Sequence, residues 1–224
     1  MIVKSFDIFD TILVRIWARP TDMFWELGVQ LRQAQLIQVS PETWQEMRVE
    51  AENIARKKTQ TGEITLGQIY EELMPAYDWS VSDFEKAIQY EIELERVSIV
   101  PVPVNQQKIQ ELHKQRQSII YISDMYLPSE VIQGFLKDHE IWAEGDKIYI
   151  SGEVGENKGS GKLFQHHITQ HQLTASQLHH TGDNLYSDIK VPKKLGINVQ
   201  PFLETHLNRY ESSIADDRLL PLRF

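Results

Sequence analysis

Hydrophobic residues follow two different spacings along the chain. Between residues 20 and 98 they recur every three or four positions, which predicts about four amphipathic helices and no strand. Elsewhere, short apolar runs typical of buried parallel strands occupy residues 2–6, 118–122 and 147–150. Residues 178–181 give a fourth, weaker strand signal, and residues 197–199 a fifth. Helical patterns separate the last four of these segments from one another. The sequence therefore predicts an α/β fold with a parallel five-stranded sheet and a separate helical block.

Polar residues and prolines mark where helices and domains begin. Ser40 followed by Pro41 starts one helix of the block, and Ser82 with Glu85 predicts a capping box before another. The segment Val100–Pro103 is a stiff connector, because neither of its prolines can continue a helix. We therefore expect a core domain at 1–16 and 101–224 and a helical domain at 17–100.

The pattern near the C-terminus is less regular. Pro192 falls inside the helix that precedes the fifth strand, and it should kink or shorten that helix. Beyond residue 204, the spacing of Leu207, Tyr210 and Ile214 predicts one more helix, packed on the core.

Composition narrows the classes of function. The net charge of −9 over 224 residues argues against a broad surface for nucleic acid. The absence of cysteine excludes disulfides, thiolate catalysis and cysteine-based zinc sites. No stretch resembles a signal peptide or reaches the length of a membrane span, so we expect a cytoplasmic protein with no membrane partner. An acidic protein that handles an anionic substrate must supply positive charge locally, from a lysine, a metal ion or helix N-termini.

Polar residues stand where the predicted strands end. Asp7 ends the first strand, and Ser123 with Asp124 ends the second. Lys158 lies in the loop after the third strand. Gly182-Asp183 ends the fourth strand, and Asp188 follows five residues after Asp183. Crossover connections bring these strand ends to one edge of the sheet. A carboxylate placed there is poorly solvated unless it meets a cation or takes part in chemistry.

This set of groups suits phosphoryl transfer through a covalent aspartyl intermediate. Asp7 would be the nucleophile, Ser123 would hydrogen-bond the transferring group, and Lys158 would neutralise charge on both. Asp183 and Asp188 would hold Mg²⁺, a hard ion that prefers oxygen ligands.

The motifs resemble those of the haloacid dehalogenase (HAD) superfamily. Phe6–Thr11 resembles its first motif, Ser123 stands at the second, Lys158 at the third, and Gly182-Asp183 with Asp188 at the fourth. The resemblance covers essentially the whole chain, and the helical block falls where the family inserts a C1 cap. More narrowly, the chain is similar to a HAD group with the sequences FDIFDT and SDMYLP, here Phe6–Thr11 and Ser123–Pro128.

The resemblance implies a HAD-like Rossmannoid core with an inserted all-α C1 cap, and a Mg²⁺-dependent hydrolase of the phosphatase type. Its substrate would be a small phosphorylated metabolite, and it would form an aspartyl-phosphate. The metal ligands implied are Asp7, the backbone carbonyl of Phe9, Asp183 and Asp188. We expect Thr11, Ser123, Asp124, Lys158 and Arg15 around the substrate, and Arg15 at the hinge has the alternative of pairing with an acid.

One position departs from the pattern of HAD phosphatases. Phe9 stands where they carry a second aspartate, the general acid and base, and losing such a group costs about 10²–10⁴-fold in rate. Asp124, which directly follows Ser123, is the better substitute, with the alternative that it only orients the loop. The side chain of Asp10 is expected to point elsewhere.

Phe9 also keeps other functions open. Dehalogenases of the superfamily lack that aspartate and need no metal, whereas the pattern of Asp183 and Asp188 makes most sense around Mg²⁺. C–P hydrolases replace the aspartate with a small residue and use a cap lysine, for which Lys57 and Lys58 are candidates. A non-catalytic binding or interaction protein is the third alternative.

Several other groups have a structural explanation. His167 and His171 share a helix face, and we expect that face to be solvated rather than to bind zinc. Strand alternation should point either His179 or His180 into the core as a satisfied histidine. Lys162 should lie on a helix and face solvent.

Overall fold

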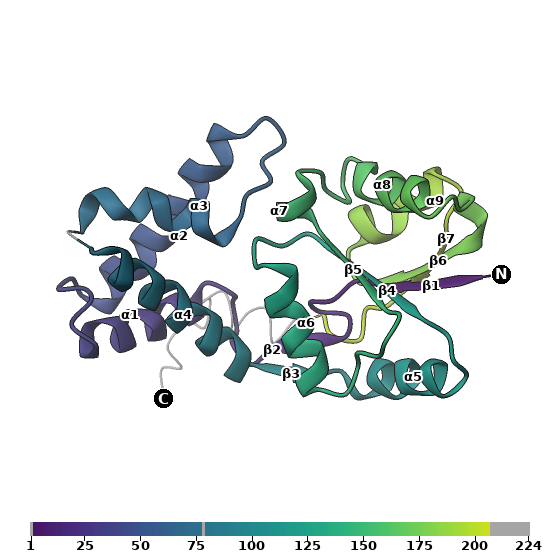
Figure 1. Cartoon of the computed structure of the whole chain (residues 1–224), viewed down its shortest axis with the longest axis horizontal. Coiled ribbons are helices and arrows are strands. Elements are labelled where there is room, and N and C mark those ends of the chain that lie inside the picture. The colour runs from purple at the N-terminus through teal and green to yellow at the C-terminus, as the bar shows by residue number, and fades with distance from the viewer. Residues whose placement is uncertain (1, 78, 207–224) are drawn as a thin grey trace, which may run out of the picture.

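The computed structural model describes residues 2–77 and 79–206 of the protein. Its centre is a parallel sheet with the strand order β5-β4-β1-β6-β7 (Figure 1). The strands are β1 (Val3–Phe6), β4 (Ile119–Ser123), β5 (Lys147–Ile150), β6 (Leu178–Gly182) and β7 (Asn198–Pro201). The predicted α/β class and the parallel five-stranded sheet are therefore confirmed.

Helices cover both faces of the sheet, which explains why every residue of the central strand β4 is buried. Phe6 and Tyr121 belong to the core that contains α5 (Pro103–Lys114) and α6 (Ser129–Asp138). Ile120 and Ile122 pack on the other face against residues of α8 (Lys162–Gln170). Figure 1 shows α8 and α9 (Val191–Lys194) on one side of the sheet and α5 on the other.

The helical block lies to one side of the sheet (Figure 1). It consists of α1 (Asp22–Gln33), α2 (Pro41–Lys58), α3 (Leu66–Leu73), the short helix η1 (Met74–Ala76) and α4 (Val81–Val97). This confirms the predicted helices. Inside the block the guanidinium of Arg48 is fully buried and donates two hydrogen bonds, of 2.8 and 2.6 Å, to the Glu91 carboxylate.

The helix starts agree with the sequence in part. Ser40 caps α2 with Pro41 at the first helical position, as predicted. The capping box of α4 is wrong by two residues, because Ser80 and Asp83 form it instead of Ser82 and Glu85. Both pairs have the same spacing, and the turn that leads into α4 selects the earlier one.

Two short strands connect the block to the core. β2 (Leu13–Arg15) pairs antiparallel with β3 (Ile99–Pro101), so the entry and exit segments lie side by side. The predicted connector Val100–Pro103 is therefore partly a strand, and Pro103 begins α5. Its missing N–H costs nothing at a helix start.

The block also contacts the loops at the carboxyl end of the sheet. The backbone N–H of Leu66 donates to the carbonyl of Tyr126 (2.8 Å), and Asn157 Nδ2 donates to Glu63 Oε1 (3.0 Å). A Cβ atom on Gly152, in α7 (Ser151–Val154), would lie 2.3 Å from the carbonyl oxygen of Ile64. Only glycine permits this approach.

The segment around Pro192 is irregular, as predicted. A π-helix, η3 (Leu185–Lys190), precedes the short α9 helix that contains this proline. The remaining element is the short helix η2 (Ala175–Gln177). The predicted helix through Leu207, Tyr210 and Ile214 lies outside the described residues. Among the described helices, none is both long enough and apolar enough to span a membrane.

Candidate active site

The carboxyl ends of three adjacent strands carry the predicted site residues. Strand β1 pairs with β4 at Phe6↔Tyr121 and with β6 at Phe6↔Thr181. Both registers bring the residues after Phe6 to the level of the strand ends that carry Ser123 and Asp183. The sheet thereby brings together the segments that contain Asp7, Ser123 and Asp183, although the first and the second are more than a hundred residues apart in the sequence.

A buried lysine links two of the carboxylates. The ammonium of Lys158 lies 2.5 Å from Asp7 Oδ1 and 2.6 Å from Asp188 Oδ1. All three residues are at most 5% exposed. Lys158 comes from the loop between α7 and α8, and Asp188 comes from η3. Charge-assisted hydrogen bonds of this length hold the carboxylates in fixed positions.

Asp183 lies at the open side of this cluster. The hydroxyl of Thr11 is 3.3 Å from Asp7 Oδ2 and 3.4 Å from Asp183 Oδ1, so it lies between the two carboxylates. Asp7, Asp183 and Asp188 each present one oxygen within 4.8 Å of the others. Three carboxylates so close together fit a divalent cation with oxygen ligands.

The electrostatics favour added positive charge. Burial raises the pKa of Asp7 well above its ordinary value, and Asp188 and Asp183 add to this while Lys158 opposes it. Burial also opposes the charged form of Lys158, but Asp7 and Asp188 raise the pKa of its ammonium overall, so it stays protonated. One ammonium cannot neutralise three carboxylates, and a bound Mg²⁺ would supply the missing charge.

His180 contacts the cluster from the buried interior of the core. Its Nε2 lies 3.0 Å from Asp188 Oδ1 and its Nδ1 lies 2.9 Å from the Ser5 hydroxyl, with all three residues fully buried. His180 is thus the core histidine predicted by strand alternation. Its contact with Asp188 gives it the additional role of fixing that carboxylate.

The remaining predicted residues lie around the cluster. Ser123 is 2% exposed at the end of β4. Asp124 is exposed, and its Oδ1 accepts the backbone N–H of Lys158 at 2.9 Å, which fixes the Lys158 loop. Although the residue as a whole is exposed, desolvation of its carboxyl raises the pKa of Asp124, the direction that a general acid requires.

Phe9 and Arg15 form a stacked pair at the start of the helical block. The Arg15 guanidinium lies over the Phe9 ring, and its Nε donates to Glu95 Oε1 at 2.7 Å. Arg15 therefore does pair with an acid, one of the two alternatives. Glu95 comes from α4, 80 positions away, and no spacing in the sequence indicated this partner.

A cavity of about 600 Å³ adjoins the cluster. Its lining includes Asp10, Arg15, Trp17, Asp183 and His206. Asp10 has a left-handed backbone (φ 59°), and its pKa is raised by burial and by the charge of Asp183. Because it lines the same cavity as Asp183, Asp10 lies beside the site, contrary to the expectation that it points elsewhere.

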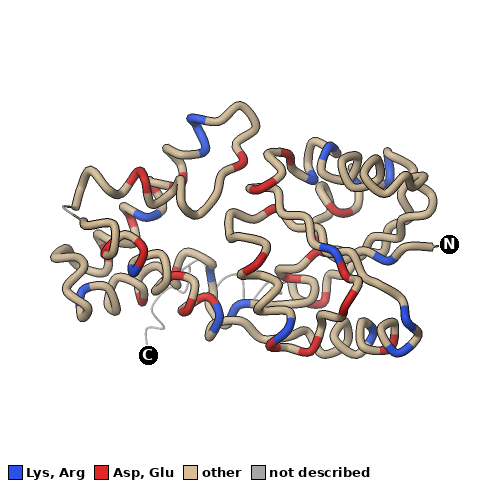
Figure 2. The backbone as a smooth tube through the Cα atoms, in the orientation of Figure 1, with Lys and Arg blue, Asp and Glu red and all other residues tan. Residues whose placement is uncertain are grey.

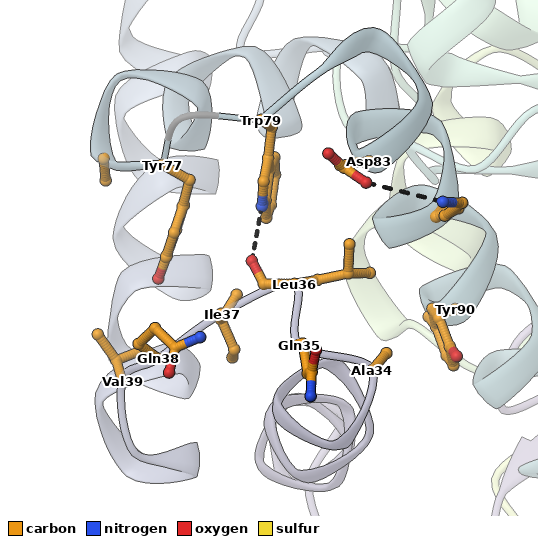
Figure 3. A pocket seen from close by; sticks show the side chains of 12 residues that line it. Ala34, Gln35, Leu36, Ile37, Gln38, Val39, Tyr77, Trp79, Asp83 and Tyr90 are labelled. Atoms are coloured by element: carbon orange, nitrogen blue, oxygen red, sulfur yellow. Dashed lines mark hydrogen bonds and ion pairs between the residues drawn. The ribbon is translucent and has the colours of Figure 1, made fainter.

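Figure 3 shows a second, larger cavity of about 860 Å³ within the helical block. The Tyr77 and Trp79 rings stack there at 4.8 Å, and Trp79 Nε1 donates to the Leu36 carbonyl at 2.7 Å. None of the residues that line this cavity belongs to the strand-end cluster.

Two further predictions concern α8. Lys162 faces solvent and pairs with Glu156, as expected. The solvated face predicted for His167 and His171 is wrong at His167, which is fully buried with both ring nitrogens unpartnered. His171 is exposed, and its Nε2 lies 2.5 Å from the Tyr149 hydroxyl.

Comparison with solved structures identifies the fold. A 2-haloacid dehalogenase from Pseudomonas syringae pv. Tomato DC3000 superposes with a TM-score of 0.64 at 16% identity, over 93% of this chain and 89% of the other. A HAD phosphatase from Thermococcus onnurineus gives 0.61 at 15% identity, over 97% and 98%. A HAD family enzyme, bt-2542 from Bacteroides thetaiotaomicron, in complex with magnesium and inorganic phosphate, gives 0.57 at 14% identity, over 93% and 98%.

These similar structures are HAD-superfamily hydrolases, and the chain has their fold: a Rossmann-like α/β core with attached helices. The resemblance seen in the motifs is thus confirmed at the level of the fold. No sequence profile of a protein family and no curated protein matches the chain.

Proposed function

We propose that the protein is a Mg²⁺-dependent hydrolase of the HAD superfamily that removes phosphate from a small phosphorylated metabolite. The observation that carries this proposal is the buried Lys158 ammonium between Asp7 and Asp188, with Asp183 within reach of the same space. The HAD phosphatase and the phosphate complex of bt-2542, which share the fold, support the same class of substrate.

Asp7 is the proposed nucleophile. Its carboxylate attacks phosphorus, forms a new O–P bond, and the bond from phosphorus to the ester oxygen breaks with its electron pair leaving on that oxygen. Lys158 and Ser123 stabilise the charge on the transferring group. Water then attacks phosphorus in the aspartyl-phosphate and releases inorganic phosphate, which restores Asp7.

Asp7, Asp183, Asp188 and the Phe9 carbonyl are the proposed ligands of Mg²⁺. Among the described residues, no backbone N–H donates to the Phe9 carbonyl, so its oxygen is available. Bound there, the ion would neutralise charge on the phosphoryl oxygens. Asp124 is the proposed proton donor to the leaving oxygen, because the Phe9 side chain has no ionisable proton to transfer.

Arg15 and Thr11 complete the proposed substrate contacts. The Nε of Arg15 is occupied by Glu95, and its two terminal amino groups have no hydrogen-bond partner among the described residues. These two amino groups can donate hydrogen bonds to an anionic group of a substrate in the cavity that Arg15 and Asp183 line.

We also propose that the chain divides into a core at 1–16 and 101–224 and a C1-type cap at 17–100. The pairing of β2 with β3 supports a hinge there. A cap over the strand ends would exclude water from the site. A cytoplasmic location and the lack of a nucleic-acid partner stay predictions.

A 2-haloacid dehalogenase is the second candidate function. Phe9 favours it, and so does the fold shared with the Pseudomonas syringae dehalogenase. In that reaction Asp7 would attack the carbon that bears the halogen and displace halide. A C–P hydrolase has less support, because Lys58 is exposed and pairs with Glu72.

One assay separates these functions. Phosphate release from a panel of activated and unactivated esters is measured with Mg²⁺ and with a chelator, and halide release from 2-haloacids is measured without metal. The proposal predicts phosphate release that requires Mg²⁺. Halide release without metal would favour the dehalogenase, and neither activity in the wild type or in Phe9→Asp would favour a binding protein.

A further inference from the structure

A cavity of about 740 Å³ opens at the opposite edge of the sheet from Asp7. Its walls come from the starts of β1 and β5, from the loop after α5, and from the end of α8. This amino-edge cavity, as we call it, includes Val3, Ile120, Lys147, Arg116 and His171. Its volume lies within the range of about 300–1,000 Å³ that small-molecule sites occupy.

Strand register determines the composition of its floor. Val3 aligns with Leu178 on β6, and Ile120 aligns with Lys147 on β5. Val3 and Ile120 belong to the core between the sheet and α8, so Lys147 stands over the same face. The cavity thus has an apolar floor with a cation at its rim.

Positive charge gathers around this floor. Arg116 and Lys147 are exposed, and neither forms an ion pair with a described residue. The hydroxyl of Tyr149 lies 2.5 Å from Nε2 of His171 and thereby fixes that ring at the cavity wall. Lys4 also lines the cavity, but its ammonium is bonded to His179 at 2.7 Å. Figure 2 shows basic residues at the start of β1 and in the loop after α5, at the end of the molecule where the N-terminus lies.

No aspartate or glutamate is among the residues that line the described part of this cavity. The neighbouring Asp146 is buried, and its oxygens accept from the Ile119 and Ala143 amides and contact His113 Nε2. Its charge is therefore engaged away from the opening. The net charge of the chain is −9, yet two exposed cations without an ion-pair partner among the described residues stand around this apolar floor.

We propose that the amino-edge cavity binds a small organic anion with an apolar body and two negative groups. The apolar body would lie on Val3 and Ile120, and the negative groups would meet Arg116 and Lys147. Ser118 and Gln117 at the rim supply neutral hydrogen-bonding groups. This site is independent of the proposed hydrolysis, because it lies at the other end of the strands.

The test is calorimetric titration of the full chain with naphthalene-2,6-disulfonate. We expect saturable binding of one molecule per chain, weakened by added salt. The double variant Arg116→Glu with Lys147→Glu should weaken binding about tenfold or more. The matched control, Lys137→Glu with Lys193→Glu, makes the same change in net charge at exposed positions elsewhere and should keep the affinity within about twofold.

Further titrations test where the disulfonate binds and which anionic group the cavity prefers. Asp7→Asn should leave the affinity for the disulfonate unchanged, because Asp7 is not in this cavity. Naphthalene-2,6-dicarboxylate, and naphthalene-2,6-diyl bisphosphate tested in Asp7→Asn, show whether carboxylate or phosphate groups are preferred. No saturable binding of any probe, an equal loss in the control variant, or equally tight binding of inorganic sulfate would each overturn the proposal.

Discussion

The guanidinium carbon of Arg15 lies 4.2 Å from the centre of the Phe9 ring. By the resemblance of the first motif, Phe9 would stand where HAD phosphatases carry their proton-transferring aspartate, and its ring supports a cation beside the cavity that contains Asp183. A cation–π contact of this kind contributes about 0.5–2 kcal/mol. Under the proposed function, Phe9 would hold Arg15 at a position where a phosphatase would have a proton donor.

Replacing this ring by a carboxylate should restore proton transfer. We expect Phe9→Asp to raise kcat on esters with poor leaving groups, by up to about 10²–10⁴-fold, and to change it little on activated esters. The measurement is kcat for both ester classes with Mg²⁺ present. Equal turnover of wild type and variant on the poor leaving groups would show that another residue already performs this step.

Lys158 should be essential for the stability of the metal-free protein. Lys158→Met leaves Asp7 and Asp188 buried without their cation, and removing one partner from a buried ion pair costs about 3–5 kcal/mol. Urea unfolding in the presence of a chelator measures the loss. Lys162→Met is the matched control, because that lysine is exposed, and it should change the free energy of unfolding by less than about 1 kcal/mol. Equal effects in the two variants would contradict this assignment.

His180 should act through Asp188 on metal affinity. We expect His180→Ala to weaken Mg²⁺ binding by about 10–100-fold, because it releases a carboxylate that the histidine holds. His180→Gln can keep a donor towards Asp188 and should recover part of the affinity. His179→Ala is the control, since that ring contacts Lys4 and not the cluster. Titration of thermal stability with Mg²⁺ reports affinity without requiring turnover, and unchanged affinity in His180→Ala would refute the role.

Stability should fall in acid because of His167. Burial, with His171 and His166 nearby, lowers the pKa of His167 from 6.5 to about 4. The unfolded chain therefore takes up the proton first. The contribution of neutral His167 is present in full above pH 6.5 and is lost as the pH falls towards 4, a loss of about 3 kcal/mol.

Substitution separates this effect from other acid titrations. The groups that face the His167 ring are His171, at 4.7 Å between ring centres, and Tyr149, at 4.9 Å. His167→Leu removes two unpartnered buried nitrogens and should raise stability while flattening its dependence on pH between 4 and 6.5. His166→Leu, at an exposed position, should keep the wild-type slope in urea unfolding. A slope unchanged by His167→Leu would show that other groups cause the acid sensitivity.

The sequence predicted the sheet because apolar runs mark β1, β4 and β5, and weaker strand signals mark β6 and β7. It also predicted that Asp7, Lys158, Asp183 and Asp188 would lie together, since each follows a strand whose end is fixed by crossover topology. Glu95 could not be predicted, because its partnership with Arg15 depends on how β2 and β3 bring the helical block to the core.

Local sequence patterns failed where tertiary packing or backbone conformation decided the outcome. Ser80 and Ser82 each stand three residues before an acid, so tertiary packing decided which one caps α4. Helical spacing put His167 beside His171 but not inside the core, because exposure depends on the rotation of α8 against the sheet. Asp10 lies beside the site on a left-handed backbone, which periodicity does not report.

The most direct measurement asks whether Asp7 becomes phosphorylated. The protein is mixed with Mg²⁺ and a phosphate ester that it turns over, quenched in acid, and digested for mass spectrometry. We predict a phosphorylated peptide that contains Asp7, present in the wild type and absent in Asp7→Asn. Mg²⁺-dependent phosphate release that persists in Asp7→Asn, or a phosphoryl group on any other residue, would contradict the account.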